Sequence, residues 1–273
     1  ERDNRKPMKR EWVAVVAILL TLGRGALREI EKTAAREIQQ RIGGKISVRI
    51  ELDGARGLTE GKIKQLTVRA QGFTLDGFPF TLEPERPKSG HIRRFVMYLQ
   101  DARLRGLRAE TAWAEIPDIY YDRQLALSRR IFRLSDTGVG PAEIVVNQDD
   151  LADYIRRKYA PYIREVRVNI TPTQTLVEGV TVLLTSEVRF RAMGVLKPRE
   201  GRYLDLAEAQ IEIEGAELPP QAVELLRQWL NPIIDLERDL GIYDGLYVDS
   251  VVSEAGRMRA VGKAWIPAPK RGE

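Results

Sequence analysis

Residues 45–52 read KISVRIEL, and this stretch determines the class of fold. Every second position is apolar, and the positions between them are charged or polar. The apolar set is Ile46, Val48, Ile50 and Leu52. Side chains of a β-strand point alternately to its two faces. The stretch therefore predicts a strand with one buried and one solvated face.

The same alternation recurs along most of the chain. It is found at residues 63–70, 78–82, 92–99, 107–116, 142–146, 166–170, 180–184, 188–192, 204–213, 246–252 and 258–266. A slip at Lys64-Gln65 suggests a β-bulge in the first of these. Strands with one polar face are typical of antiparallel sheets that have water on one side. We therefore expect a predominantly antiparallel sheet.

Three amphipathic helices interrupt the strands. Their apolar residues recur at spacings of three and four over residues 26–42, about 150–160, and about 219–230. They are the elements available to cover the apolar face of the sheet. We predict an α+β fold in which a long curved sheet wraps around these helices. If they do not fill the concave side, an apolar groove remains; otherwise helices and sheet fill each other completely.

The N-terminal residues resemble an export signal. Lys9 and Arg10 precede the apolar run Trp12–Leu22, and small residues follow at Gly23 and Gly25. This is the layout of a signal peptide. The run spans about 16 Å, which is short for a membrane helix. We expect residues 1–25 to be a leader, cleaved or kept as a short anchor, with the natural start at Met8. The alternative is a buried helix that continues into residues 26–42.

Residues 26–270 are expected to form a single elongated domain. A helix followed by an alternating strand occurs at 26–52 and again at 150–170, and both are followed by a Glu-Gly pair, Glu60-Gly61 and Glu178-Gly179. This indicates a weak internal repeat, although such short motifs also recur by chance.

Composition limits the chemistry. The chain has no cysteine and one histidine, His91, so thiolate chemistry and sites with two imidazoles are excluded. No phosphate-binding, nucleotide-binding or hydrolase motif is present. Asp149-Asp150 is interpreted as a helix cap. The net charge is +5, but residues 1–10 hold five basic and two acidic residues, so the remainder lacks the concentrated positive face that nucleic acid needs. We expect no enzyme, no metal and no cofactor.

One segment carries a family resemblance. Residues 229–236 read WLNPIIDL and follow the strand IEIEG at 211–215 and Leu218-Pro219. Together with Glu60-Gly61-Lys62-Ile63 and the segment 142–159, this pattern resembles the LmeA-like family of bacterial phospholipid-binding envelope proteins. The resemblance covers roughly residues 26–266. It implies a fold similar to the tubular lipid-binding proteins and no catalytic residues. Residues 118–140 depart from the pattern.

Within the segment, Pro232 is expected to end the helix at Asn231, whose side chain would bond nearby backbone, and Asp235 to cap a following turn. These roles are structural; contact with a ligand is the alternative.

The candidate ligand contacts lie on the inner faces of the second and third helices. They are Leu151, Ile155, Tyr159, Leu225, Leu226 and Trp229. Ordinary core packing is the alternative for all six. Arginines on the strands, at 93, 94, 103, 105, 164, 167, 189 and 191, either form a solvated outer face or border the groove and meet lipid phosphates.

We therefore expect an exported protein of the bacterial cell envelope or periplasm, with residues 8–25 either removed or kept as an anchor at the inner membrane. It would bind phospholipid or another acyl-chain lipid, meet a membrane surface, and support envelope lipid or glycolipid metabolism. The alternatives are an envelope scaffold and, less favoured, a hydrolase acting on glycolipids, which needs paired carboxylates beside the groove. The sequence does not indicate the oligomeric state.

Overall fold

The computed structural model describes residues 24–54, 57–77, 81–129, 133–160, 162–183, 186–214, 220–242 and 244–269. The predicted leader lies outside these residues except for Arg24 and Gly25, which begin the first described helix, α2 (Arg24–Ile42). In this part of the chain, no helix is long and apolar enough to cross a membrane.

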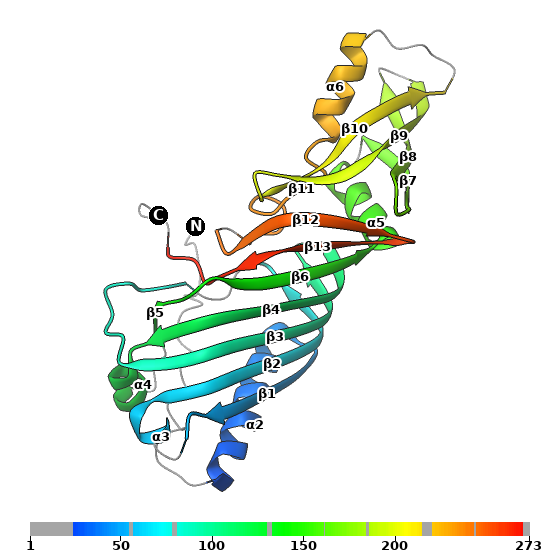
Figure 1. Cartoon of the computed structure of the whole chain (residues 1–273). Coiled ribbons are helices and arrows are strands. Elements are labelled where there is room, and N and C mark those ends of the chain that lie inside the picture. Colours follow the sequence, from blue (N-terminus) through cyan, green and yellow to red (C-terminus); the bar gives the residue numbers. More distant parts are fainter. Residues whose placement is uncertain are drawn as a thin grey trace, which may run out of the picture.

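The larger of two sheets has eight strands and curls into a half-barrel (Figure 1). Its order is β1 (Lys45–Leu52), β2 (Lys62–Leu75), β3 (Gly90–Leu104), β4 (Leu107–Tyr121), β6 (Gly140–Asn147), β13 (Arg257–Ala264) and β12 (Leu246–Glu254). The short strand β5 (Leu134–Asp136) pairs with the end of β4. The expectation of a predominantly antiparallel fold is confirmed.

The KISVRIEL stretch is β1, at one edge of this sheet. Its Lys45, Ser47 and Arg49 are exposed, whereas Ile50 is buried, so the alternation marks a strand as predicted. β1 pairs with β2 from Lys45–Gln71 to Leu52–Ile63, and the register slips between Glu51 and Leu52. The slip leaves Lys64 without a partner residue, which confirms the predicted bulge.

One pair of strands departs from the expectation. β2 and β3 are parallel, with Lys62 beside His91 and Leu75 beside Leu104. Parallel neighbours require a crossover between the end of one strand and the start of the next. Residues 76–89 make this crossover. Alternation alone does not reveal strand direction, because both faces look the same in either orientation. The strand predicted at 78–82 lies partly outside the described residues; within it, Leu82 forms an isolated bridge to Leu134.

The second sheet is antiparallel and has five strands. Its order is β11 (Ile234–Asp235), β10 (Tyr203–Ile213), β9 (Ser186–Arg199), β8 (Thr175–Leu183) and β7 (Ile163–Ile170). In the chain it is inserted between β6 and β12, which belong to the first sheet. Helix α6 (Pro220–Leu230) follows β10 and extends beyond the sheet (Figure 1).

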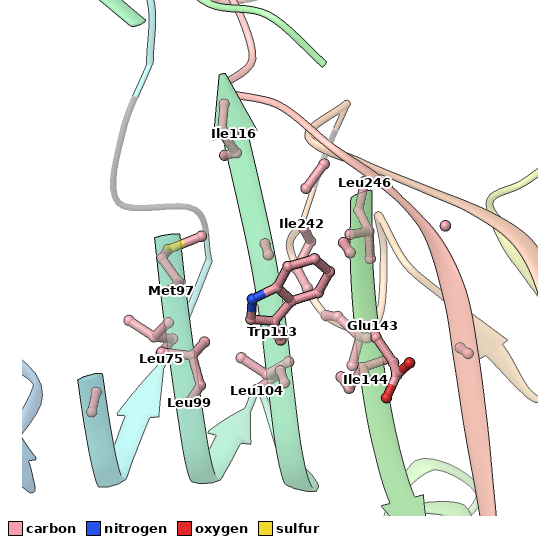
Figure 2. Close-up of a pocket in the computed structure, with 18 of the residues that line it drawn as sticks. Leu75, Met97, Leu99, Leu104, Trp113, Ile116, Glu143, Ile144, Ile242 and Leu246 are labelled. Carbon is pink, nitrogen blue, oxygen red and sulfur yellow. The ribbon is translucent and has the colours of Figure 1, made fainter. Parts of the chain in front are cut away.

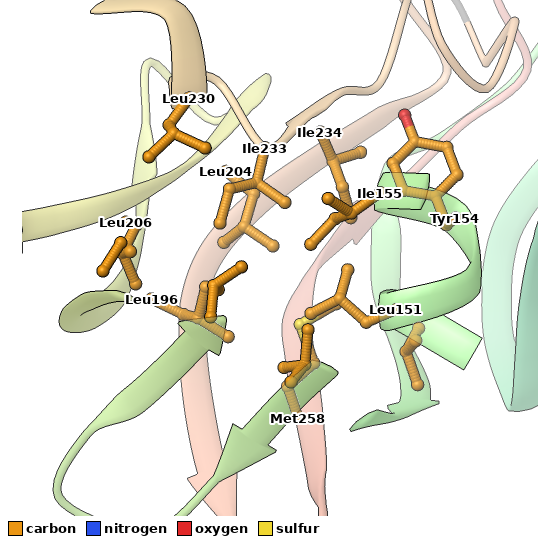
Figure 3. Close-up of a cluster of buried hydrophobic side chains, with 14 of the residues drawn as sticks. Leu151, Tyr154, Ile155, Leu196, Leu204, Leu206, Leu230, Ile233, Ile234 and Met258 are labelled. Carbon is orange, nitrogen blue, oxygen red and sulfur yellow. The ribbon is translucent and has the colours of Figure 1, made fainter. Parts of the chain in front are cut away.

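The largest hydrophobic core joins the two sheets. Helix α5 (Gln148–Lys158) supplies Leu151, Tyr154 and Ile155. The first sheet supplies Met258, and the second supplies Leu196 and Leu206, so that all meet in one cluster (Figure 3). The junction of the sheets is therefore packed with side chains.

The structure does not show the sheet wrapped around three helices. Only α2 of the predicted helices lies along the groove described below, and α5 packs at the junction of the sheets. Two further short helices, α3 (Gly57–Glu60) and α4 (Arg123–Arg129), lie at strand ends. Helices α2 and α5 are each followed by an antiparallel strand pair, as the proposed repeat requires. A duplication of the sequence itself stays a prediction.

Candidate functional site

An apolar groove lies on the concave side of the half-barrel. Its cavity volume is about 180 Å³, and the groove contains about 1350 Å³ of empty space when its open side is included. Side chains from α2, six strands of the sheet and the segment before β12 line it, and Figure 2 shows residues of the strands and of that segment. They include Leu75, Met97, Leu99, Leu104, Ile116, Ile144, Ile242 and Leu246.

The groove is open because small residues occupy the inward positions in its centre. Ala114 of β4 pairs with Ala142 of β6, which pairs with Gly262 of β13. Larger residues flank this row, with Met97 beside Ala114 and Val248 beside Gly262. The row therefore has large apolar side chains at its ends and only methyl groups or a hydrogen atom at its centre. This difference in size leaves a trough along the sheet. The adjacent row repeats the pattern with Ala112 and Ala260 on either side of Ile144.

Gly262 also permits a close approach of two strands. A Cβ atom there would lie 1.9 Å from the carbonyl oxygen of Tyr247 and 2.9 Å from Cα of Val248. The register between β12 and β13 slips directly after Val248. Any side chain at this position would therefore force the wall of the groove apart.

Helix α2 forms the border of the groove beside β1 and β2. Ile38 is buried and Ile42 is half-buried, and both line the groove. The helix is fixed to the sheet by Glu31, whose Oε1 accepts a hydrogen bond from the backbone N–H of Ile50 at 2.8 Å. This contact ties α2 to the inner edge of β1.

Trp113 and Glu143 also border the groove, but their positions alternate with the small inward residues. Trp113 pairs with both Tyr98 and Glu143. Successive residues of a strand point to opposite faces, so the side chains belong to the convex face. There they border a second, polar hollow together with Arg69. Both residues border the groove because their neighbours in the strand point into it, Ala112 and Ala114 for Trp113 and Ala142 and Ile144 for Glu143.

One end of the groove is closed by a packed core. Beyond Phe95, Ile116 and Ile266, a second cluster fills the half-barrel, including the fully buried Ile92 and Tyr121. Burial raises the pKa of the Tyr121 phenol to about 12. Its hydroxyl donates a hydrogen bond to the carbonyl of Gly61 at 3.0 Å. Because side chains fill this end, a polar group of a bound molecule would have no path to solvent there.

The six predicted contact residues lie elsewhere. Leu151 and Ile155 are buried at the junction of the sheets (Figure 3). Tyr159 and Leu226 are partly buried and pack against the same cluster. None of these four lines the groove. The side chains of Leu225 and Trp229 lie outside the described residues. That any of the six contacts lipid stays a prediction.

The LNPIID segment has structural roles in the described fold. Asn231 pairs with Leu206 through two hydrogen bonds, accepting from its N–H at 2.8 Å and donating to its carbonyl at 3.2 Å. The prediction of a bond to nearby backbone is therefore wrong, because the partner lies on β10, 25 residues earlier in the chain. Asp235 accepts from the N–H groups of Glu237 and Arg238, which confirms the predicted cap.

A buried ion pair holds the segment against α5. Nζ of Lys158 lies 2.7 Å from Asp239 and donates to the carbonyls of Pro232 and Ile233 at 2.9 Å. The Lys158 and Asp239 side chains are only 12% and 9% exposed. These bonds hold the turn after α6 in place by contacts within the fold.

Most strand arginines singled out in the sequence have carboxylate partners. Arg93 pairs with Asp53, Arg94 with Glu115, Arg164 with Glu187, Arg189 with Glu214, and Arg191 with Glu178. These pairs form a solvated face, which was one of the two expectations. Arg105 differs, because it forms no ion pair with a carboxylate of the described residues and its Nε donates to a backbone carbonyl.

Carboxylates are scarce in the groove. Glu143 is the one acidic residue among those that line it, and its Oε2 lies 3.6 Å from Nη1 of Arg259. The carboxylate pair expected of a glycolipid hydrolase is not found among the lining residues. Over the described residues, no group of three His, Cys, Asp or Glu side chains could hold a metal ion.

The sequence-based prediction missed the residues that line the groove, because it placed the ligand contacts on helices and the groove is lined mainly by strands. A signal was present in the strands themselves. Positions 112, 114, 142, 260 and 264 are inward positions occupied by alanine, where a filled sheet core would carry larger side chains.

These features define a β-sheet protein with an open apolar groove. The model of the LmeA-like phospholipid-binding family matches residues 21–263, nearly the whole chain, and the protein belongs to this family. Comparison with curated proteins and with solved structures finds no match.

Proposed function

We propose that the protein is an exported cell-envelope protein that holds phospholipid by its acyl chains in the groove of the half-barrel. The observation that carries this proposal is the row Met97–Ala114–Ala142–Gly262, which keeps an apolar trough open along the sheet. The family supports a phospholipid as the ligand. The leader-like residues 8–25 support export.

The groove has the chemistry that acyl chains require. Transfer of a methylene from water into apolar surroundings contributes about 0.8 kcal/mol. The lining residues offer almost no hydrogen-bonding side chains, so a sugar or nucleotide would lose its contacts with water without replacement. A chain of methylenes loses nothing in this way. The groove therefore selects for hydrocarbon.

The activity is binding without bond chemistry. A lipid with its acyl chains against Ile116 and Ile144 would be shielded from water on the side of the sheet. The open side of the groove would allow the lipid to enter from a membrane surface. Such a protein would support envelope lipid or glycolipid metabolism by carrying or presenting a lipid.

The direct test is the lipid content of the purified chain. The full chain is produced in bacteria, isolated without detergent, extracted with organic solvent and analysed by mass spectrometry. We expect phospholipid near one molecule per chain. A chain that contains no phospholipid and also takes up none from vesicles would overturn the proposal and favour an envelope scaffold.

A further inference from the structure

Arg105 occupies the end of the groove opposite to the closed core. It lies in the turn between β3 and β4, and its Nε donates to the carbonyl oxygen of Asp76 at 2.8 Å. A Cβ atom at Gly77, which lines the groove, would lie 3.9 Å from its Nη2. The guanidinium group is thus placed at the groove by a backbone contact.

Gly241 packs against the same guanidinium group. A Cβ atom at Gly241 would lie 2.5 Å from Cζ of Arg105. Gly241 is flanked by Leu240 and Ile242, and both of these line the groove. The guanidinium plane therefore lies directly beside apolar lining residues. Its location is set by two glycines, each with a positive φ.

Arg105 has spare capacity to bind an anion. Its exposed guanidinium forms no ion pair with a carboxylate of the described chain, in contrast to Arg93 and Arg94. Its two terminal amino groups donate to no acceptor in that same part of the protein. A guanidinium with both amino groups available matches two oxygens of a phosphate group.

A second arginine adds positive charge at the same turn. Arg157 of α5 donates from Nη2 to the carbonyl of Gly106, the residue after Arg105. The carboxylates of Asp101 and Asp150 nearby are both paired with Arg108. Asp76, which binds Arg105 through its backbone carbonyl, is exposed. The turn therefore favours an anion.

We propose that Arg105 binds the phosphate of a phospholipid whose acyl chains extend from the β3–β4 turn toward Phe95 and Ile116. The inference rests on the proposed function and adds the orientation of the lipid and its anion-binding residue. The closed end cannot take a charged group, because burial of an unpaired charge is strongly unfavourable. The end with Arg105 can accept a charged group, because the guanidinium would pair with it.

The test compares two lipids that differ only in the phosphate. Vesicles of phosphatidylcholine contain either dioleoyl phosphatidic acid or dioleoylglycerol, and the amount of each taken up by the full chain is measured by mass spectrometry. For Arg105→Gln we expect uptake affinity for phosphatidic acid to fall about 10- to 100-fold, as for loss of a charged hydrogen bond. Affinity for dioleoylglycerol should be unchanged.

Arg103→Gln is the matched control, because Arg103 lies near the end of β3, two residues before Arg105, and is exposed outside the groove lining. This variant removes the same charge and should leave the uptake of both lipids unchanged. Equal effects of Arg103→Gln and Arg105→Gln would overturn the proposal. So would an Arg105→Gln variant that keeps its preference for phosphatidic acid.

Gly241→Ala provides a second route to the same residue. The added methyl group displaces the guanidinium, so phosphatidic acid uptake should fall in the otherwise unchanged chain but not further in Arg105→Gln. Strain at this φ of +65° is monitored by thermal unfolding, and it is the same in both backgrounds. Additive losses would contradict the assignment.

Two further outcomes separate the two proposals. If the unchanged chain takes up neither lipid, the proposed function fails, and the assignment of Arg105 fails with it. If millimolar inorganic phosphate prevents the preference for phosphatidic acid and itself binds equally well, Arg105 is a site for free phosphate and the lipid orientation is wrong. Preference that persists in excess phosphate supports the lipid headgroup.

Discussion

Ala114 and Ala142 face each other across β4 and β6 at the centre of the groove. Two methyl groups here leave the space that larger side chains would fill. The pair is flanked by Met97 on one side and Gly262 on the other. The width of the groove therefore depends on this contact more than on the large residues along its borders.

Ala114→Phe should block the groove. The ring would occupy the space above Ala142, so lipid recovered with the protein should fall at least about tenfold, since many methylene contacts are lost. Because the space is empty, the cost to folding should stay below the usual overpacking cost of about 1–3 kcal/mol. Lipid content and thermal unfolding are measured together.

Ala255→Phe is the control for this variant. Ala255 lies in the exposed turn between β12 and β13 and carries the same change of side chain outside the groove. Normal lipid content in Ala114→Phe would show that the ligand does not lie in the groove.

Leu151→Ala tests the junction of the sheets. Leu151 is 0% exposed, so truncation should create a cavity and lower the free energy of unfolding by about 2–5 kcal/mol. The folded fraction should retain lipid, because the residue does not line the groove. Chemical denaturation gives the first quantity and mass spectrometry the second. A lipid-free but fully stable variant would restore Leu151 as a contact.

Lys158→Ala should be strongly destabilising. The change leaves Asp239 buried without its cation and removes the donor to the carbonyls of Pro232 and Ile233. Loss of one partner of a buried pair costs about 3–5 kcal/mol. Arg164→Ala, which breaks an exposed pair with Glu187, should cost less than about 1 kcal/mol. Similar urea midpoints for both variants would refute this difference.

Alkaline pH should destabilise the fold through Tyr121. Its pKa is raised by burial to about 12 in the folded protein, against about 10 in the unfolded chain. The unfolded chain therefore loses the proton first, and the contribution is present below pH 10 and lost as pH rises through 12. A difference of about two pKa units corresponds to a contribution of about 3 kcal/mol to the free energy of unfolding.

Tyr121→Phe should flatten the decline in the free energy of unfolding between pH 10 and 12. Tyr98→Phe, at an exposed position, should leave the decline unchanged. Identical pH profiles for the two variants would show that the Tyr121 phenol is not held neutral by its surroundings.

Alternation in the sequence predicted the strands well, since it follows from side chains pointing to two faces. It identified β1 and the bulge at Lys64, and it offered the solvated arginine face as one of two interpretations. It could not predict that β2 and β3 are parallel, because direction depends on how residues 76–89 return. It also could not show that two sheets divide the strands.

The site was harder to predict than the fold. Leu151 and Ile155 have the pattern of an amphipathic helix, which is the same for a helix packed into a core and for one beside a ligand. The groove depends on which residues become cross-strand neighbours, as in the pairing of Ala142 with Gly262. That pairing joins parts of the chain far apart in sequence, and alternation carries no information on it.

The insertion of the second sheet between β6 and β12 has a consequence for biosynthesis. Val146 of β6 can pair with Met258 only after the whole five-stranded sheet between them has been translated. At about 5–20 residues per second, this delay is on the order of ten seconds. During that time the nascent chain presents an unpaired strand edge beside an apolar trough, a combination that promotes aggregation.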